Sequence, residues 1–309
     1  MRRFFKLGPA FLILIVFVFL TIHYFDGKQV WKGVSELFEH PFLLVTMWIV
    51  YFLSFCLKGW AWQLYLKGKA RFSTCLLGIL YSLLVNHLLP IKVGDLVRAK
   101  ILSVRDDKVN YEEALHSVVV LRVLDMLCLI GITLTGLLGL DVSFKFPVWS
   151  IIAGSIFCII TLSVLHKYFP AFLKRHISLL KNALLGRNGL AIILITFFSW
   201  VLEGGILYGT VLALKGDLSF FETVFSNSIT IAGQIFQITP GGIGNYESFL
   251  VFALGLFGFP LIEGYTIAVI THFMKFLFSY MAGAVVILIY PVSFKTVKGW
   301  VWIKGVRRK

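Results

Sequence analysis

Two polar segments interrupt apolar stretches of the chain, and their composition suits the binding of a charged group. The first is Asn86-His87-Leu88-Leu89-Pro90-Ile91-Lys92-Val93-Gly94-Asp95, and the second is Pro240-Gly241-Gly242-Ile243-Gly244-Asn245-Tyr246-Glu247. Proline and glycine break a helix, and a helix that restarts beyond the break presents free N–H groups that bind an anion such as phosphate. We therefore expect the backbone of a site here, shaped by Asn86, Pro90, Pro240, Gly241, Gly242 and Gly244.

Cationic side chains gather around the first segment and could bind the same anion. Lys92 and Arg98 flank Gly94, which allows a close approach of the backbone, and Asp95 could orient them. The alternative is that these basic residues only anchor the segment at a membrane surface, which requires no ligand. Both interpretations can hold together.

A charged pair also lies inside a long apolar stretch. Arg122 and Asp125 are three residues apart, so they can pair on one face of a helix. Either they neutralise each other as a structural contact, or Arg122 offers its planar guanidinium to a phosphate while Asp125 orients it.

Two acids accompany the second segment. Glu247 ends this segment, and Glu203 lies in the preceding apolar stretch. Either carboxylate could handle a coupling proton or a cation, although Glu247 could equally cap a helix start. Lys275 and His272, three residues apart in the last apolar stretch, could supply the opposing positive charge.

The composition is typical of an integral membrane protein. Of 309 residues, 59% are apolar and 14% are charged, compared with about 45–50% and about 25% in soluble domains. The four cysteines lie in apolar stretches without a CxxC pair, so we expect no disulfide, no metal site and no cofactor.

Six stretches are long enough to cross a bilayer, which takes roughly 20 apolar residues in a helix. They run 8–25, 42–66, 112–140, 148–166, 189–214 and 261–290. No small-residue cleavage site follows the first stretch, so we expect it to be retained and not removed as a signal peptide. The predicted fold class is all-α, with about six full spans.

The two stretches that carry the polar segments, 73–104 and 222–259, are broken in the middle. This pattern predicts two re-entrant helical hairpins, which are tolerated where they are buried in protein or line a wet cavity. If both termini are cytoplasmic, 22 of the 29 Lys and Arg fall inside, 4 outside and 3 within spans, as the positive-inside rule requires. A full crossing at the first hairpin would place the basic stretch 92–108 outside.

The hairpins occupy matching positions in the chain. Each follows a span and a Lys-Gly link, which is Lys67-Gly68 in the first case and Lys215-Gly216 in the second. We therefore expect two units of opposite orientation, 42–140 and 189–290, which is the inverted repeat common in secondary transporters. The alternative is a chance match of two Pro-x3-Gly motifs in a chain rich in glycine.

The net charge of +14 is explained without nucleic acid. Residues 167–188 place apolar side chains at helical spacing between basic ones, which predicts a helix on the cytoplasmic surface. The basic tail 293–309, which carries two tryptophans, should likewise bind anionic headgroups.

Three motifs, taken in order, resemble the transmembrane, flippase-like region of lysylphosphatidylglycerol synthases, the multiple peptide resistance factors. They are Asn86-x3-Pro90-x-Lys92-x-Gly94-Asp95-x2-Arg98, Arg122-x2-Asp125, and Pro240-Gly241-Gly242-x-Gly244-x2-Glu247. The resemblance covers nearly the whole chain. Lys92 stands where an arginine is expected, and Ile238-Thr239-Pro240 stands where Pro-x-Pro is typical. Full-length members continue into a soluble synthase domain, whereas this chain ends at Lys309, so we expect the flippase-like half alone.

The resemblance implies a translocase in the cell membrane for an anionic or aminoacylated phospholipid or a polyprenyl phosphate. Lys92, Gly94, Arg98 and Arg122 would bind the lipid phosphate. The orienting or coupling residues would be Asp95, Asp125, Glu203, Glu247 and Lys275. The alternatives are a phosphatidylglycerol lysyltransferase that confers resistance to cationic peptides, and a non-transporting scaffold for a cell-envelope enzyme. The expected partners are membrane lipids and a separate lipid-modifying enzyme or glycosyltransferase, with no nucleic acid.

Overall fold

A computed structural model of the chain describes residues 17–89, 92–142, 185–234 and 239–291, with scattered positions between 163 and 184. All regular structure in these ranges is helical. The predicted span 148–166, the basic tail 293–309 and Pro90 lie wholly or largely outside the described residues, and the predicted surface helix 167–188 is described only at scattered positions before 184.

Four helical stretches among the described residues are long and apolar enough to cross a membrane. They are α3 (Pro41–Tyr65), α6 (Tyr111–Gly139), α13 (Leu261–Ile289), and α9 (Gly189–Glu203) continued by α10 (Gly205–Ala213). These helices confirm four of the six predicted spans. Of the first predicted span, the described part is helical at 17–24.

One helix was not predicted from the sequence. α2 (Gly27–Glu39) begins at Asp26, whose carboxylate accepts hydrogen bonds from the N–H groups of Lys28 and Gln29 at 2.9 and 3.2 Å. It buries Leu37 and packs against α13, α3 and α10. The segment is too polar to cross a membrane, so the long apolar stretches of the sequence do not include it.

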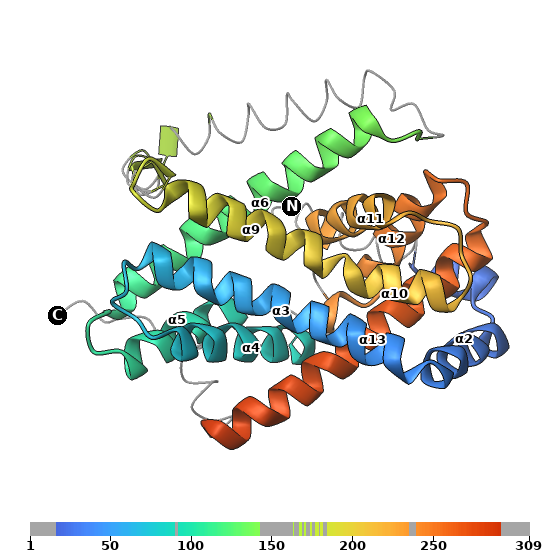
Figure 1. Ribbon diagram of the computed structural model, residues 1–309, viewed down its shortest axis with the longest axis horizontal. Helices are drawn as coiled ribbons and strands as arrows, with labels where there is room; N and C mark the ends of the chain where they lie inside the picture. Colours follow the sequence, from blue (N-terminus) through green and yellow to red (C-terminus); the bar gives the residue numbers. More distant parts are fainter. Residues whose placement is uncertain are drawn as a thin grey trace.

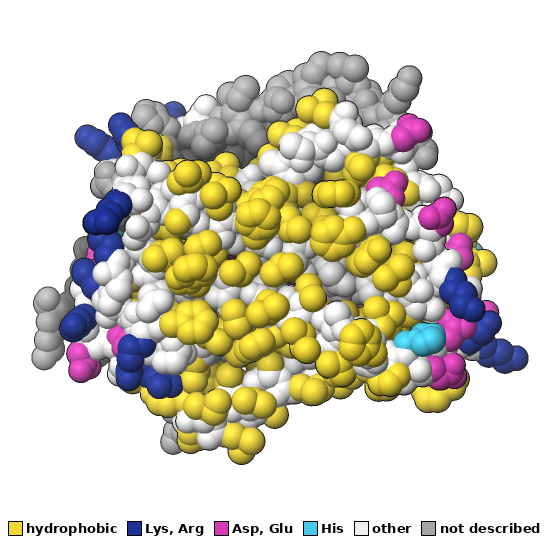
Figure 2. All heavy atoms as spheres, in the orientation of Figure 1, with side chains coloured by type: hydrophobic (Ala, Val, Ile, Leu, Met, Phe, Trp, Pro, Cys, Tyr) yellow, Lys and Arg dark blue, Asp and Glu magenta, His cyan; other side chains and the backbone are white. Residues whose placement is uncertain are grey.

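The surface divides into an apolar belt and two charged ends. In Figure 2, hydrophobic side chains cover the middle of the visible face, Lys and Arg dominate its left edge, and acidic residues mix with basic ones at its right edge. The left end in Figure 1 is where α3 and α5 finish and α9 begins, next to Lys67, Lys69, Arg71 and Arg105. The belt matches what a bilayer core requires of the surface facing it.

Each predicted hairpin is a pair of helices around a break. The first hairpin consists of α4 (Phe72–Leu88) and α5 (Gly94–Arg105), and the second of α11 (Phe220–Gly233) and α12 (Asn245–Gly255), with the short helix η2 (Pro240–Gly242) in its break. In both, the helices pack on each other and the two ends meet. Arg71 before α4 bonds Asp106 after α5 at 2.9 Å, and Phe225 in α11 lies 5.7 Å from Phe257, ring to ring.

The Lys-Gly links before the hairpins share one geometry. Lys67 and Lys215 adopt the left-handed conformation, with φ of 52° and 55°, which is uncommon outside glycine. In each link the N–H of the following glycine bonds the carbonyl five residues back, at 3.2 and 2.9 Å. Both spans therefore end in the same capping motif, which turns the chain into the hairpin.

The packing of the two units is reciprocal. α3 packs along α9, α4 of the first hairpin packs against α13, and α11 of the second hairpin packs against α6 (Figure 1). Each hairpin thus contacts the span that follows the other hairpin. A two-fold relation between the units would produce this exchange; the inverted repeat itself stays a prediction.

Candidate functional site

The two hairpin breaks face one central cavity of about 150 Å³. Since a water molecule occupies about 30 Å³ in the liquid, the cavity has room for about five waters or a group the size of phosphate. Its polar lining comes from both hairpins and from the spans α3, α6, α9 and α13. The main polar residues are Lys58, Ser82, Asn86, His87, Lys92, Arg98, Arg122, Asp125, Glu203, Gln234, His272 and Lys275.

Asn86 and Gly94 hold the first break closed on itself. The Asn86 side-chain oxygen accepts a hydrogen bond from the Gly94 N–H at 2.9 Å. A Cβ on Gly94 would lie 2.3 Å from the carbonyl oxygen of Ser82, so only glycine fits against α4 here. Because Asn86 takes this amide, the Gly94 N–H at the break is bound by a side chain; the backbone anion site stays a prediction.

Three glycines shape the second break. Gly241, Gly242 and Gly244 all adopt positive φ, between 63° and 85°, which other residues reach only with strain. A Cβ on Gly241 would lie 2.1 Å from the ring of Phe276. Pro240 opens η2, and this short helix contacts α4, so the tips of the two hairpins meet.

Arg122 binds two carboxylates. Its Nε and Nη2 donate to the two oxygens of Asp95, at 2.9 Å each, and its Nη1 lies 3.5 Å from Asp125. The predicted contact with Asp125 is therefore present, but Asp95 on the first hairpin is the closer partner. Asp125 also accepts a hydrogen bond from the Trp200 indole at 3.0 Å. This cluster joins the first hairpin to α6 and α9.

Glu203 binds two cations from different spans. Lys58 donates a hydrogen bond to one of its oxygens, and the Lys275 ammonium lies 3.6 Å from the other. Lys275 also donates to the Asn227 side chain at 3.0 Å, and Lys58 lies 3.5 Å from the centre of the Trp200 ring. Glu203 and Lys275 are 5% and 3% exposed, so the group is a buried ion cluster.

His272 contacts Glu247 and the glycine turn at the second break. The His272 Nδ1 lies 2.7 Å from a Glu247 oxygen, and its Nε2 lies 3.1 Å from the Gly241 carbonyl oxygen. The other Glu247 oxygen accepts the Gly244 N–H at 2.6 Å. These contacts join α13 to the glycine turn of the second hairpin.

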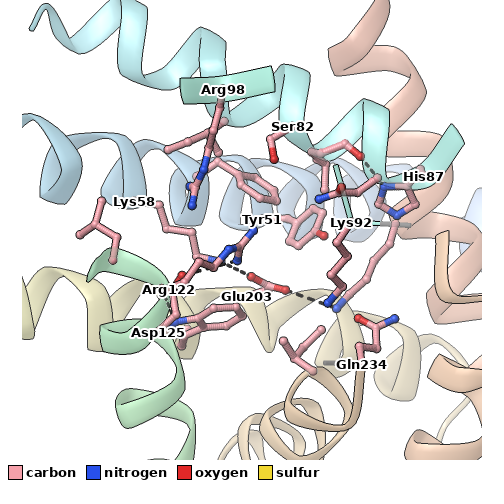
Figure 3. Close-up of a pocket in the computed structure, with 18 of the residues that line it drawn as sticks. Tyr51, Lys58, Ser82, His87, Lys92, Arg98, Arg122, Asp125, Glu203 and Gln234 are labelled. Atoms are coloured by element: carbon pink, nitrogen blue, oxygen red, sulfur yellow. Dashed lines mark hydrogen bonds and ion pairs between the residues drawn. The ribbon is translucent and has the colours of Figure 1, made fainter. Parts of the chain in front are cut away.

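Lys92 and Arg98 are the least neutralised cations of the cavity. Lys92 makes no ion pair or hydrogen bond with any residue that the structure describes. Arg98 is 6% exposed, and its Nε lies 3.1 Å from Asp95, but its Nη2 has no hydrogen-bond partner in the described part of the chain. Both side chains extend into the cavity from the first hairpin, opposite Asp125 and Gln234 (Figure 3).

Two apolar grooves meet the polar residues of the site. The first groove, about 590 Å³, runs between α5 and α6 and shares Lys92 and Arg122 with the central cavity. The second, about 520 Å³, lies along α13 beside residues 17–25 and shares His272 with the cavity. Apart from these polar ends, aliphatic residues dominate the first groove and aromatic and aliphatic residues the second.

Sequence reasoning assigned no role to Lys58, Trp200 or Ser82. Lys58 carried a usable signal, because a charge inside a predicted span is a functional candidate. Trp200 and Ser82 carried none, since both types are ordinary in membrane helices. No group of three His, Cys, Asp or Glu side chains within the described residues could hold a metal ion.

The family comparison agrees with these features. A family model described as the lysylphosphatidylglycerol synthase TM region matches residues 8–283. The chain belongs to this family. The match spans the two hairpins and the four described spans, so the helical membrane region is the part that the chain shares with the family. No curated protein and no solved structure matches the chain.

Proposed function

We propose that the protein moves a phosphate-bearing lipid between the two leaflets of a cell membrane. The observation that supports this most is the junction of a cation-lined cavity with two apolar grooves, which share Lys92, Arg122 and His272 with it. A lipid has the same two parts, a charged headgroup and apolar chains. A soluble substrate would have no use for the grooves.

In this proposal the headgroup crosses through the cavity while the chains stay in the apolar grooves. Lys92 and Arg98 bind the phosphate, because their positive charge is the least compensated. Arg122 and Glu203 hold the first hairpin and the spans in place around it through their ion pairs. The headgroup thereby avoids the cost of entering hydrocarbon, which amounts to several kcal/mol for a charged group.

We place the protein in the inner membrane, with the N-terminus and the ends of the first hairpin on the cytoplasmic side. Lys67, Lys69, Arg71 and Arg105 lie at that end of the described bundle, as expected of a cytoplasmic face. The second hairpin then enters from the outer face. A cysteine at Lys108 should react with an impermeant thiol reagent only from inside, and one at Asp217 only from outside; labelling of both from one side would exclude opposite hairpins.

The rival function is phosphatidylglycerol lysyltransferase, which the family description names as a synthase. That chemistry requires a site for lysyl-tRNA, a polyanion, next to the lipid. A scaffold for a cell-envelope enzyme is the other alternative. It requires neither a polar cavity nor grooves that reach it.

Reconstitution tests the proposal. The purified protein is reconstituted in vesicles with labelled phosphatidylglycerol. The fraction of the label that a membrane-impermeant quencher reaches is measured over time. We expect faster exchange between leaflets than in protein-free vesicles, and no aminoacylated lipid when lysyl-tRNA is added. Absence of exchange for both phosphatidylglycerol and a polyprenyl phosphate would contradict the proposal, and formation of lysyl lipid would support the enzyme.

A groove variant makes the assay specific. Val123→Trp should obstruct the first groove and slow the exchange, because Val123 lines it. Leu134→Trp is the matched control, since Leu134 is similarly exposed on the same helix, at 55% against 40%, but lies outside the groove. Equal rates for the two variants would remove the groove from the path.

A further inference from the structure

The charges of the central cavity do not balance. Its cationic side chains are Lys58, Lys92, Arg98, Arg122 and Lys275, whereas the carboxylates that pair with them are Asp95, Asp125 and Glu203. Five cations against three carboxylates leave an excess of two positive charges. Glu247 is outside this count, because it faces His272 and the Gly244 N–H and does not line the cavity.

The excess is concentrated on Lys92 and Arg98. Lys92 has no partner among the described residues, and the Arg98 Nη2 is buried without a hydrogen-bond acceptor there. Arg98 is buried, so its donor without an acceptor is costly, whereas Lys92 is exposed where the cavity meets the first groove and carries an uncompensated charge there. An anion that enters the cavity would satisfy both groups at once.

The carboxylates, in contrast, are all engaged. Both oxygens of Asp95 accept from Arg122, and the two oxygens of Glu203 face Lys58 and Lys275. Asp125 accepts from Trp200 and faces Arg122. An ammonium group on a headgroup would find no free carboxylate here and would meet Lys92 and Lys275 instead.

From this imbalance we infer that the substrate is a lipid with an anionic phosphate headgroup that lacks amines, and that aminoacylated lipids are excluded. The inference rests on the proposed function and narrows it. Phosphatidylglycerol and a polyprenyl phosphate share this chemistry, whereas lysylphosphatidylglycerol adds two ammonium groups. Specificity then comes from repulsion of the wrong headgroup as well as attraction of the right one.

The test compares labelled lipids in vesicles that contain the full chain. The probes are phosphatidylglycerol, a polyprenyl monophosphate and lysylphosphatidylglycerol. We expect at least one of the two anionic lipids to exchange about tenfold faster or more than the lysyl lipid, which corresponds to about 1.4 kcal/mol. Which one moves identifies the source of the phosphate. If lysylphosphatidylglycerol exchanged as fast as the two anionic lipids, the inference would be overturned but the proposed function would stand. If none of the three lipids exchanged, the inference and the proposed function would both be overturned.

A charge reversal tests the assignment to Lys92. Lys92→Glu should lower the ratio of anionic to lysyl lipid transport about tenfold or more, because it replaces attraction by repulsion. Lys108→Glu is the control, since Lys108 is exposed outside the cavity and should leave the ratio unchanged. If Lys92→Glu fails to fold, Lys92→Met removes the charge alone and should lower the same ratio. An unchanged ratio in a folded Lys92 variant would contradict the assignment.

Discussion

Arg122 donates two hydrogen bonds of 2.9 Å to Asp95 and so joins span α6 to the first hairpin. The two residues lie 27 positions apart, on the consecutive helices α5 and α6. Because Asp125 also faces Arg122, the guanidinium is compensated by two carboxylates. The main role of Arg122 is therefore to fix the first hairpin against α6, and phosphate binding falls mainly to Lys92 and Arg98.

Replacing Arg122 should therefore destabilise the protein. Arg122→Gln leaves Asp95 with Arg98 alone and Asp125 without its closest cation. Because the Arg122 side chain is 38% exposed, the cost should be below the ~3–5 kcal/mol of a fully buried pair. Thermal unfolding in detergent should show a lower Tm. The double variant Asp95→Asn/Arg122→Gln should recover part of the loss, with a coupling of about 0.5–3 kcal/mol. Strictly additive effects would show that the two residues do not interact.

Glu203 should matter more for stability than either of its lysines. Glu203→Gln leaves Lys58 and Lys275 facing each other without a counter-ion, whereas Lys58→Met leaves Glu203 paired with Lys275. We expect Tm to fall in the order wild type, Lys58→Met, Glu203→Gln. Glu39→Gln, on an exposed helix end, is the control and should leave Tm unchanged. A Glu203→Gln variant as stable as this control would contradict the ion cluster.

His272 should hold the glycine turn of the second hairpin. His272→Ala removes the contacts with Glu247 and the Gly241 carbonyl, so amides in 241–247 should exchange with deuterium about tenfold faster or more. Glu247→Gln should have a smaller effect, because its amide oxygen still accepts from Gly244 and its NH₂ can donate to a neutral ring. Unchanged exchange in His272→Ala would show that the turn holds without this residue.

Gly94 should not tolerate a methyl group. Its Cβ would overlap the Ser82 backbone, so Gly94→Ala must displace α5 from α4 and should cost about 1–3 kcal/mol. Gly131→Ala provides the comparison, because nothing lies within 4 Å of a Cβ there and alanine favours a helix by about 1 kcal/mol. Unfolding measurements should separate the two variants. Equal Tm values would show that the hairpin is loosely packed.

The sequence predicted the four spans found in the described residues because each is a long apolar run, and the hairpin breaks because Pro240 and the glycines interrupt such runs. It also placed Glu203, Lys275 and His272 among the candidates, since charged and polar groups stand out in apolar helices. It did not reveal which charges pair. Arg122 and Asp95 lie on the consecutive helices α6 and α5, whereas Glu203 and Lys58 lie 145 residues apart, so the first contact depends on how the hairpin packs on its own span and the second on how the two units pack. α2 was not predicted because it is an amphipathic helix of polar composition, which forms no long apolar run.

The central claim is that the cation-lined cavity between the hairpins carries the lipid headgroup, and the exchange rate of labelled phosphatidylglycerol or polyprenyl phosphate in vesicles tests it most directly. Lys92→Met and Lys108→Met each remove one positive charge, the first inside the cavity and the second on an exposed loop. The account predicts that Lys92→Met slows the exchange about tenfold or more, since a hydrogen bond to a charged group contributes about 1.5–3 kcal/mol, while Lys108→Met keeps the wild-type rate. Equal rates for the two variants, both folded and reconstituted at the same density, would contradict it.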